Sequence, residues 1–212
     1  MRKLLAISFF VVLLFSITSC SKNGSNASDV QTTDCSTPPY RLGTTITMSA
    51  VGGDYKKTTT FNLVTTYNGI NYFGYNETTN SGTVASYFGE DSSENIWQLT
   101  LPFQDFPQRN EIIYKPNQSI GTSWSYTYAS VSQPSLISYK NTYQVIKNGI
   151  VFNLGGKTYM DCSEIQETLE TFRNGVSEGP GGSSGHTWAC DIGFVQAFNN
   201  GSLSYTLTSY TY

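Results

Sequence analysis

From residue 40 onward, apolar and polar side chains alternate over many short stretches of the chain. Trp124, Tyr126 and Tyr128 alternate with serine and threonine. The same spacing recurs at Ile46–Met48, Trp97–Leu101, Tyr143–Val145 and Leu203–Leu207. Successive side chains of a strand point to opposite faces, so this period places the apolar residues on one face of each strand. Together with the abundance of Thr, Tyr, Val, Ile and Phe, the pattern predicts an all-β fold of antiparallel sheets.

Asn-Gly pairs separate several of these stretches. They are Asn68-Gly69, Asn148-Gly149, Asn174-Gly175 and Asn200-Gly201. Both residue types tolerate the positive φ that tight hairpin turns require, so each pair predicts a hairpin. One segment, Glu164–Phe172, also has apolar residues at helical spacing. Its threonines and its lack of a capping residue favour a strand there.

The first 20 residues have the organisation of a lipoprotein signal. Arg2 and Lys3 precede an apolar run that ends at Ile17, and Thr18-Ser19-Cys20 follows. The run is shorter than the roughly 20 residues of a spanning helix. We therefore expect residues 1–19 to be a signal peptide and Cys20 to be acylated, which anchors the chain to a membrane. An ordinary cleaved signal peptide with a cysteine near the cut is the alternative.

The remaining chain is expected to have four parts. Residues 20–39 form a flexible tether, 40–103 a first β unit, 104–116 a linker and 117–212 a second β unit. Leu42–Ile46 resembles Ile120–Trp124, and further short matches follow in the same order. The matches fit either an internal duplication or chance similarity. Two related units would form a sandwich or an open barrel.

Charge and composition exclude some partners. The chain has 12 Lys+Arg and 15 Asp+Glu, and only 13% of its residues are charged. Without residues 1–19 the net charge is about −5. No run of basic residues follows the signal region, which argues against nucleic acid and against sustained binding to anionic head groups. The 14% of aromatic residues suits half-buried strands, and a few exposed rings at sheet ends would suit sugar binding.

Three cysteines remain besides Cys20. Cys35 lies in the tether, and Cys162 and Cys190 flank the glycine-rich segment 173–185. If that segment is a loop that reverses the chain, Cys162 and Cys190 face each other across a hairpin and can form a disulfide. Cys35 is then a free thiol. Two buried, reduced cysteines are the alternative.

Residues for catalysis or metal binding are few. The single histidine, His186, has no accompanying catalytic motif and is expected at a surface or strand edge. The acidic group Glu90–Asn95 could offer oxygen ligands to calcium, but a solvated turn explains it better. Glu164, Glu167 and Glu170 alternate faces on a strand and should not converge as a glycosidase pair. We expect no catalytic centre, metal site or cofactor.

A family resemblance adds to this picture. The strings IGTSWSY (120–126), GKTYMDC (156–162) and WACDIGFVQ (188–196), with the closing LTSY, resemble a group of uncharacterised lipoproteins from Bacteroidetes. That group carries recurring vGtsW, GktY and W.a.GvGlv patterns. The resemblance covers residues 116–212 well and 40–103 loosely, and it departs at Cys190-Asp191. It implies a β fold in the cell envelope and no particular activity.

These observations predict a lipid-anchored envelope protein that acts as a non-catalytic binding or structural module. A glycan-binding or glycan-processing protein and a carrier of lipid or hydrophobic cargo are the alternatives. Partners are the membrane, through Cys20, and a glycan or a protein. The group's surface-export signals are usually acidic, whereas Ser21–Asn26 has only Lys22 as a charged residue. This favours an outer-membrane anchor that faces the periplasm.

Overall fold

The computed structural model describes residues 39–79, 82–189 and 192–211, and every regular element among them is a β-strand. Within these ranges there is no helix with the length and apolarity to cross a membrane. The signal region, Cys20, most of the tether and Cys190 lie outside the described residues.

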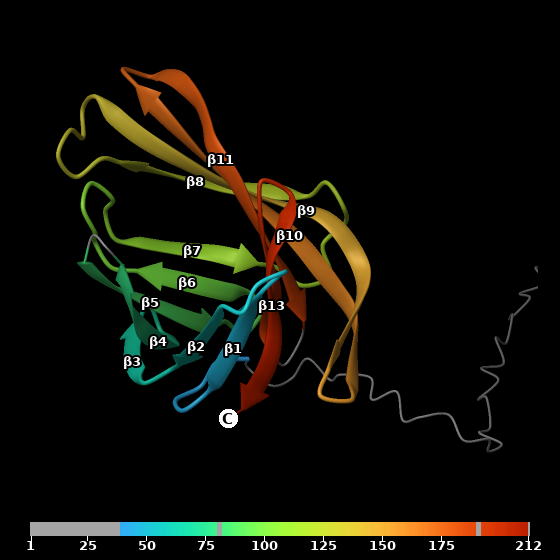
Figure 1. Ribbon diagram of the computed structural model, residues 1–212. Helices are drawn as coiled ribbons and strands as arrows, with labels where there is room; N and C mark the ends of the chain where they lie inside the picture. The colour runs from blue at the N-terminus through green and yellow to red at the C-terminus, as the bar shows by residue number, and fades with distance from the viewer. Residues whose placement is uncertain (1–38, 80–81, 190–191, 212) are drawn as a thin grey trace, which may run out of the picture.

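The strands form two antiparallel sheets (Figure 1). Sheet A has the order β2-β1-β13-β12-β11-β10-β9-β8, and sheet B has the order β3-β4-β5-β6-β7. The strands of sheet A are β1 (Thr45–Ala50), β2 (Lys56–Thr60), β8 (Ser123–Ala129), β9 (Ile137–Leu154), β10 (Lys157–Arg173), β11 (Val176–Ala189), β12 (Gly193–Asn199) and β13 (Ser202–Thr211). Those of sheet B are β3 (Leu63–Tyr67), β4 (Ile70–Thr79), β5 (Gly82–Glu90), β6 (Ile96–Thr100) and β7 (Arg109–Tyr114). The predicted all-β, antiparallel class is confirmed.

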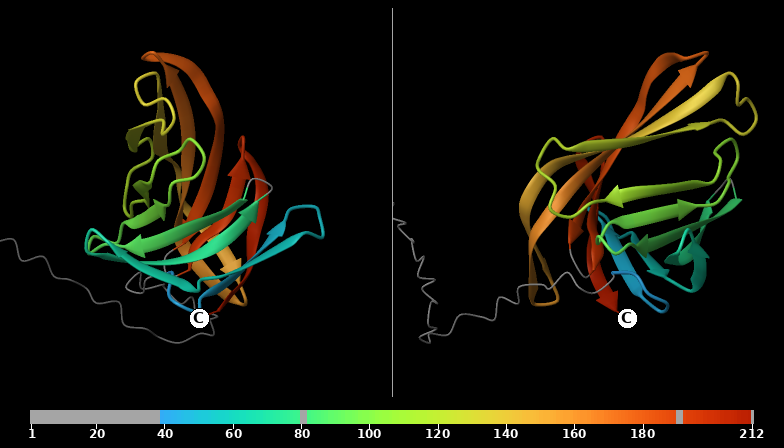
Figure 2. Two further views of the ribbon diagram at one scale, coloured as in Figure 1. Left: turned by 90° about the vertical axis from the view of Figure 1, so that its left-hand side faces the viewer. Right: turned by 180° about the vertical axis from the view of Figure 1, so that it is seen from behind.

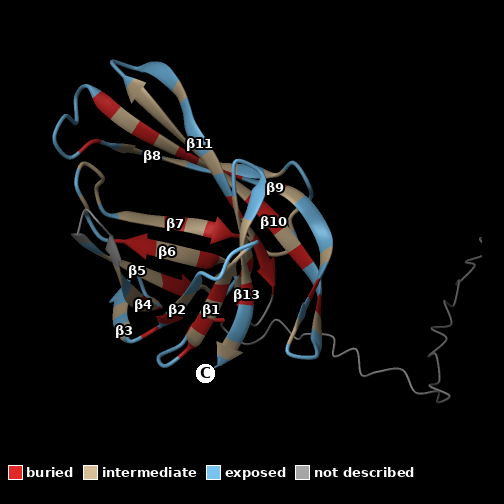
Figure 3. Ribbon diagram, in the orientation of Figure 1, coloured by how far each residue is buried: buried red, intermediate tan, exposed pale blue. Residues whose placement is uncertain are grey.

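The core lies between the two sheets. Sheet B contributes Phe88 and Ile113, and sheet A contributes Val145, Ile165 and Val195, all buried. Figure 3 shows buried residues as red bands that alternate with tan along the strands, as the two-residue period requires. The long strands β9, β10 and β11 extend past sheet B at one end (Figure 2). Burial of each large apolar side chain contributes about 1.5–3 kcal/mol to holding the sheets together.

The two sheets do not coincide with the two units expected from the sequence. Strands β1 and β2 belong to sheet A, where β1 pairs with β13 at the other end of the chain. The chain then crosses to sheet B at Phe61, which is fully buried. Strand β7 lies inside the segment 104–116 that we expected to be a linker. Local alternation identifies a strand and its buried face, but it does not identify the partner strand.

Side chains close the junction between the two sheets. Strand β7 ends sheet B and β8 ends sheet A. The backbone N–H of Ile112 on β7 donates to the Tyr126 hydroxyl at 3.0 Å, and Trp124 Nε1 donates to the Ile112 carbonyl at 2.7 Å. The predicted aromatic face of β8 is thus confirmed, and it covers main-chain groups that an edge strand would otherwise leave open.

Three of the four Asn-Gly pairs form the predicted hairpin turns. Asn68-Gly69, Asn174-Gly175 and Asn200-Gly201 each have two successive positive φ angles and link paired strands. Asn148-Gly149 instead lies within β9. Gly155-Gly156, with φ of 58° and 81°, makes the reversal between β9 and β10.

The segments on either side of Asn174-Gly175 are both strands. Strand β10 confirms the strand interpretation of Glu164–Phe172. The expectation of a long loop at 173–185 was wrong, because the turn is two residues long and the chain continues as β11. A long partner strand stabilises the glycine-rich sequence in extended form. At Gly185 the two backbones come so close that a Cβ would lie 3.1 Å from the Ile165 carbonyl oxygen.

Candidate functional site

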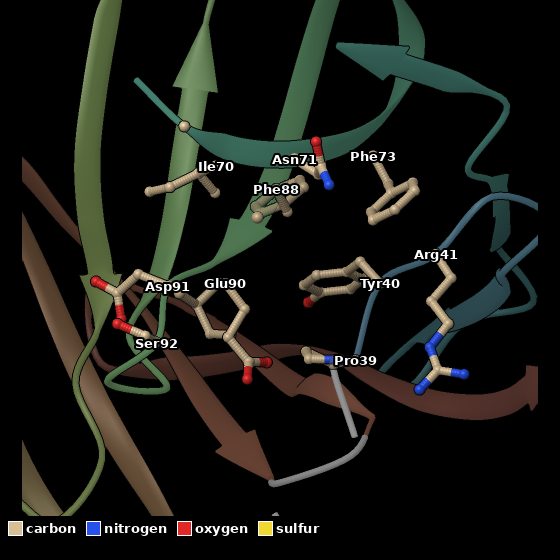
Figure 4. Close-up of a pocket in the computed structure, with 13 residues that line it drawn as sticks. Pro39, Tyr40, Arg41, Ile70, Asn71, Phe73, Phe88, Glu90, Asp91 and Ser92 are labelled. Carbon is tan, nitrogen blue, oxygen red and sulfur yellow. The ribbon is translucent and has the colours of Figure 1, made fainter. Parts of the chain in front are cut away.

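A cavity lies where the described chain begins (Figure 4). This cavity, called here the end pocket, has a volume of about 640 Å³. Pro39 and Tyr40 line one side of it, and Ile70, Phe73 and Phe88 come from β4 and β5. The end pocket is thus built by the sheet B hairpins and by the segment through which the tether enters the domain.

Tight backbone packing shapes the wall of the end pocket. The Asn68-Gly69 turn places the start of β4 beside the end of β5. A Cβ on Gly89 would lie 2.7 Å from the Asn71 carbonyl oxygen and 2.8 Å from Ile70 Cγ2. Only glycine allows this approach, because real Cβ contacts do not come so close. The two strands therefore form a continuous wall at this point.

Tyr40 fixes the other wall. Its ring stacks on Phe61 with centroids 4.8 Å apart and lies 5.0 Å from the ring of Phe88. Its hydroxyl accepts a hydrogen bond from the Phe194 backbone N–H at 3.1 Å. Burial raises the pKa of Tyr40 well above its ordinary value, so the side chain is a neutral phenol. The first residue after Pro39 is therefore both a pocket wall and part of the core.

Polar groups gather at the mouth of the end pocket. Asn71 Oδ1 accepts a hydrogen bond from the Thr66 hydroxyl at 3.0 Å. Figure 4 shows the amide nitrogen of Asn71 on the cavity side. Arg41 adds a positive charge to the lining, and Glu90 and Asp91 each add a negative charge. The end pocket therefore combines an apolar wall with a small number of polar groups, as small-molecule sites do.

The acidic group Glu90–Asn95 is a turn closed by its own hydrogen bonds. The Asp91 carboxylate accepts bonds from the backbone N–H of Ser93 at 2.8 Å, from Asn95 Nδ2 at 2.9 Å and from Trp97 Nε1 at 2.7 Å. Partial burial opposes ionisation, but these donors outweigh it and lower the pKa of Asp91. Its oxygens are occupied by protein donors. Among the described residues no three His, Cys, Asp or Glu side chains gather as a metal site.

A buried polar network crosses the space between the sheets. Glu111 on β7 accepts bonds from the hydroxyls of Tyr128 and of Tyr143, the latter at 3.2 Å. Asn141 Nδ2 donates to the Tyr143 hydroxyl at 2.8 Å and to Glu167 Oε1 at 2.7 Å. The chain of bonds therefore links two carboxylates from opposite sheets. Asn141 is fully buried, and its Oδ1 has no hydrogen-bond partner in the described structure.

Sequence reasoning missed this pair of carboxylates. Glu111 lay in the expected linker, and Glu167 was weighed only against Glu164 and Glu170. Those two do lie away from Glu167: Glu164 Oε2 pairs with Lys147 Nζ at 2.9 Å, and Glu170 accepts from a serine of β11. Burial raises the pKa of Glu111, although the Tyr128 hydroxyl opposes that shift. The sequence did offer one signal. Asn141 is a polar residue at a position of β9 that the alternation assigns to the buried face, between Tyr139 and Tyr143.

The structure also corrects the expected position of His186. It lies on β11, a central strand of sheet A, and is half-buried on the face toward sheet B. Its ring lies 5.5 Å from the ring of Phe194 and 6.3 Å from that of Trp188. Burial lowers the pKa of His186 to about 4, so the imidazole is neutral at neutral pH.

The predicted cysteine sites are only partly described. Cys162 is buried and is the one cysteine among the described residues. As a thiol it donates to the Tyr159 carbonyl at 3.6 Å, and burial raises its pKa to about 11. Ser163 faces Trp188, so continuing that register would set Ala189 opposite Cys162. Cys20 and Cys190 lie outside the described residues. The disulfide between Cys162 and Cys190 therefore stays a prediction, which peptide mapping under non-reducing conditions can test.

Comparisons with known proteins give little further guidance. No family model matches the chain, and no curated protein matches it. One similar solved structure is a proposed lipoprotein from Parabacteroides distasonis, determined at 2.70 Å. It is 12% identical, the alignment covers 82% of this chain and 97% of that chain, and the TM-score is 0.45. This resemblance is below the level that assigns two chains to one fold.

Proposed function

We propose that the chain is a lipid-anchored protein of the bacterial envelope, held at the outer membrane through Cys20 and facing the periplasm. The lipobox sequence, the short apolar run before it and the polar segment after it support this proposal. Two or more acyl chains hold a protein to a bilayer almost permanently. Cys20→Ala should therefore move the protein from the membrane fraction to the released fraction. Retention of that variant on the membrane after signal cleavage would show that the anchor is elsewhere.

The function that the geometry supports best is ligand binding in the end pocket. One observation carries this proposal: a cavity of about 640 Å³ with an apolar wall and polar groups at its mouth. Its volume lies in the range of roughly 300–1,000 Å³ that is usual for small-molecule sites. The walls are pre-formed, because Tyr40 and Phe88 are locked into the core.

A short glycan fits the chemistry of the end pocket. A sugar ring has an apolar C–H face and a rim of hydroxyl groups. The ring of Phe73 is half-buried on the pocket wall and offers an apolar surface. Asn71, Arg41 and Glu90 supply an amide, a guanidinium and a carboxylate, which together donate to and accept from hydroxyls. With Asp91, whose oxygens already accept protein hydrogen bonds, the lining has a formal net charge of −1.

Titration with chitotriose and maltotriose tests this proposal. We expect NMR shift changes for Asn71 and Phe73 at millimolar ligand, with affinity several-fold weaker in Asn71→Ala. Asn199→Ala removes an exposed amide at the far end of β12 and is the matched control. Equal losses of affinity in both variants, or no shift with either sugar, would contradict glycan binding in the end pocket.

The two alternatives have weaker support. Glu111 and Glu167 are the kind of carboxylate pair that a glycosidase needs, but Glu111 is 3% exposed and both its oxygens accept hydrogen bonds. Burial of Glu111 in the core favours binding over hydrolysis. A carrier of hydrophobic cargo needs a hollow interior, whereas large side chains from both sheets occupy this one.

A further inference from the structure

A second, smaller cavity lies between the two sheets and is separate from the end pocket. This interior chamber has a volume of about 130 Å³. Phe88 lines both cavities and forms the partition between them. Glu167 and His186 line the chamber from sheet A, and Gln98 lines it from sheet B. Glu167 is half-buried and pairs across the sheet with the exposed Ser184, which places the more open side there.

Aromatic side chains form most of the chamber wall. They are Tyr75, Phe88, Tyr143, Trp188 and Phe194. The rings of Trp188 and Phe194 meet edge to face with centroids 5.9 Å apart, and Trp188 also stacks on Tyr114. The rings are therefore held in place by the core. Because an aromatic face carries partial negative charge, a wall of this kind attracts cations.

The charge of the chamber lining also favours a cation. Glu167 is the one carboxylate in its lining, and no lysine or arginine of the described residues lines it. Glu167 Oε1 accepts a bond from Asn141, while Oε2 has only a 3.5 Å contact with the Ser184 hydroxyl. His186 is neutral at neutral pH and supplies no positive charge. Arg109 lies beside Glu111 and its positive charge acts on that carboxylate. A negative charge thus faces an aromatic space without a cation of its own.

We propose that the interior chamber binds a small alkylammonium cation, with Glu167 as its counter-ion and the aromatic rings as its walls. A cation of this class has an apolar surface that suits the rings and a positive charge that suits the carboxylate. The chamber holds the liquid volume of about four water molecules, so it takes the ammonium end of a cation such as choline, with the hydroxyethyl arm toward the more open side at Ser184. One carboxylate and one imidazole are too few ligands for a transition metal.

Choline and its neutral isostere 3,3-dimethyl-1-butanol test this site. They have nearly the same shape, and only choline carries a charge. In a Trp97→Phe, Trp124→Phe background, which leaves Trp188 as the fluorophore, we expect choline to change the fluorescence in a saturable way, and the isostere to bind about tenfold more weakly or not at all. Sodium chloride at equal ionic strength should leave the signal unchanged. Equal binding of choline and its isostere would overturn the role of charge, and no saturable binding would leave the chamber as a water-filled space.

Variants then locate the site. Glu167→Gln keeps an acceptor for Asn141 and removes the charge, so we expect choline affinity to fall about tenfold. Glu170→Gln is the matched control, because Glu170 lies on the same strand and bonds to Ser177 away from the chamber. Asn71→Ala, which alters only the end pocket, should bind choline normally. Unchanged affinity in Glu167→Gln would refute the proposal, whatever the outcome of the glycan titrations.

Discussion

Gly193 offers a sharp test of how Tyr40 is held. Gly193 begins β12 with φ of +80°, and a Cβ there would lie 2.5 Å from Tyr40 Cζ and still closer to its hydroxyl oxygen. Gly201 has nearly the same φ, +76°, and a Cβ there would meet nothing within 4 Å. Alanine at either position therefore strains the backbone similarly, but only Gly193→Ala collides with a side chain.

The two costs can be separated by magnitude. Left-handed backbone costs alanine about 1–2 kcal/mol, and both variants bear it. Overpacking typically adds about 1–3 kcal/mol. A displaced Tyr40 also gives up the bond from the Phe194 N–H, 3.1 Å long, which contributes about 1 kcal/mol. We expect a loss of about 3–6 kcal/mol for Gly193→Ala against about 1–2 kcal/mol for Gly201→Ala. For a domain of this size that is a melting-temperature drop of about 10 °C against about 5 °C.

Urea unfolding of both variants, alone and combined with Tyr40→Ala, measures these terms. In the Tyr40→Ala background the clash is absent, so Gly193→Ala should cost no more than Gly201→Ala. The reasoning fails if the two glycine variants lose equal free energy of unfolding with Tyr40 present. It fails equally if the extra loss at Gly193 persists after Tyr40 is removed, since the ring would then not be its cause.

Three further outcomes follow from other parts of the structure. Burial raises the pKa of Glu111, so the protonated side chain stabilises the fold, and this stabilisation is lost as pH rises through the raised pKa. The Glu111→Gln variant should therefore gain stability relative to wild type above about pH 4.5. Urea unfolding at acidic and neutral pH measures the difference in unfolding free energy between variant and wild type. His186 titrates in the opposite direction in both proteins, so its effect cancels in that difference, and a difference that does not change with pH would contradict the prediction. Trp124→Phe removes the donor to the Ile112 carbonyl and should cost about 1–2 kcal/mol of unfolding free energy; no loss would mean that water replaces the indole. The buried Cys162 side chain should react with iodoacetamide only after unfolding, with prior reduction if it is joined to Cys190. Rapid labelling of Cys162 itself in the native protein, located by peptide mapping, is the contrary result.

Those features that depend on neighbouring residues could be predicted from the sequence. Alternation gave the strand of Trp124, Tyr126 and Tyr128 and the face that its rings share. Asn68-Gly69 formed its turn because positive φ is a local property of those two residues. The class of the fold rests on such local signals, so it was accessible.

What the sequence did not reveal depends on pairing between distant segments. Asn148-Gly149 has the same local preference as the other pairs, yet strands β9 and β10 continue past it and Gly155-Gly156 makes the turn. Glu111 and Glu167 belong to different sheets, and their approach depends on how those sheets pack. The spacing of Glu111 and Glu167 along the chain therefore does not predict that they approach each other. The candidate sites were hidden for the same reason, since each cavity is lined from both sheets or from their junction.

The pairing of β1 with β13 has a consequence for how the protein matures. A chain that emerges N-terminus first presents the β1–β2 hairpin early, but the other neighbour of β1 in sheet A is β13, the last of the described strands to appear. Sheet B pairs its strands in the order in which they emerge, so its hairpins can form while the rest is still being delivered. Closing the loop from β1 to β13 carries the largest entropic cost and comes last. The side of β1 that faces β13 therefore stays unpaired until β13 has emerged, so completion of sheet A depends on delivery of residues 202–211.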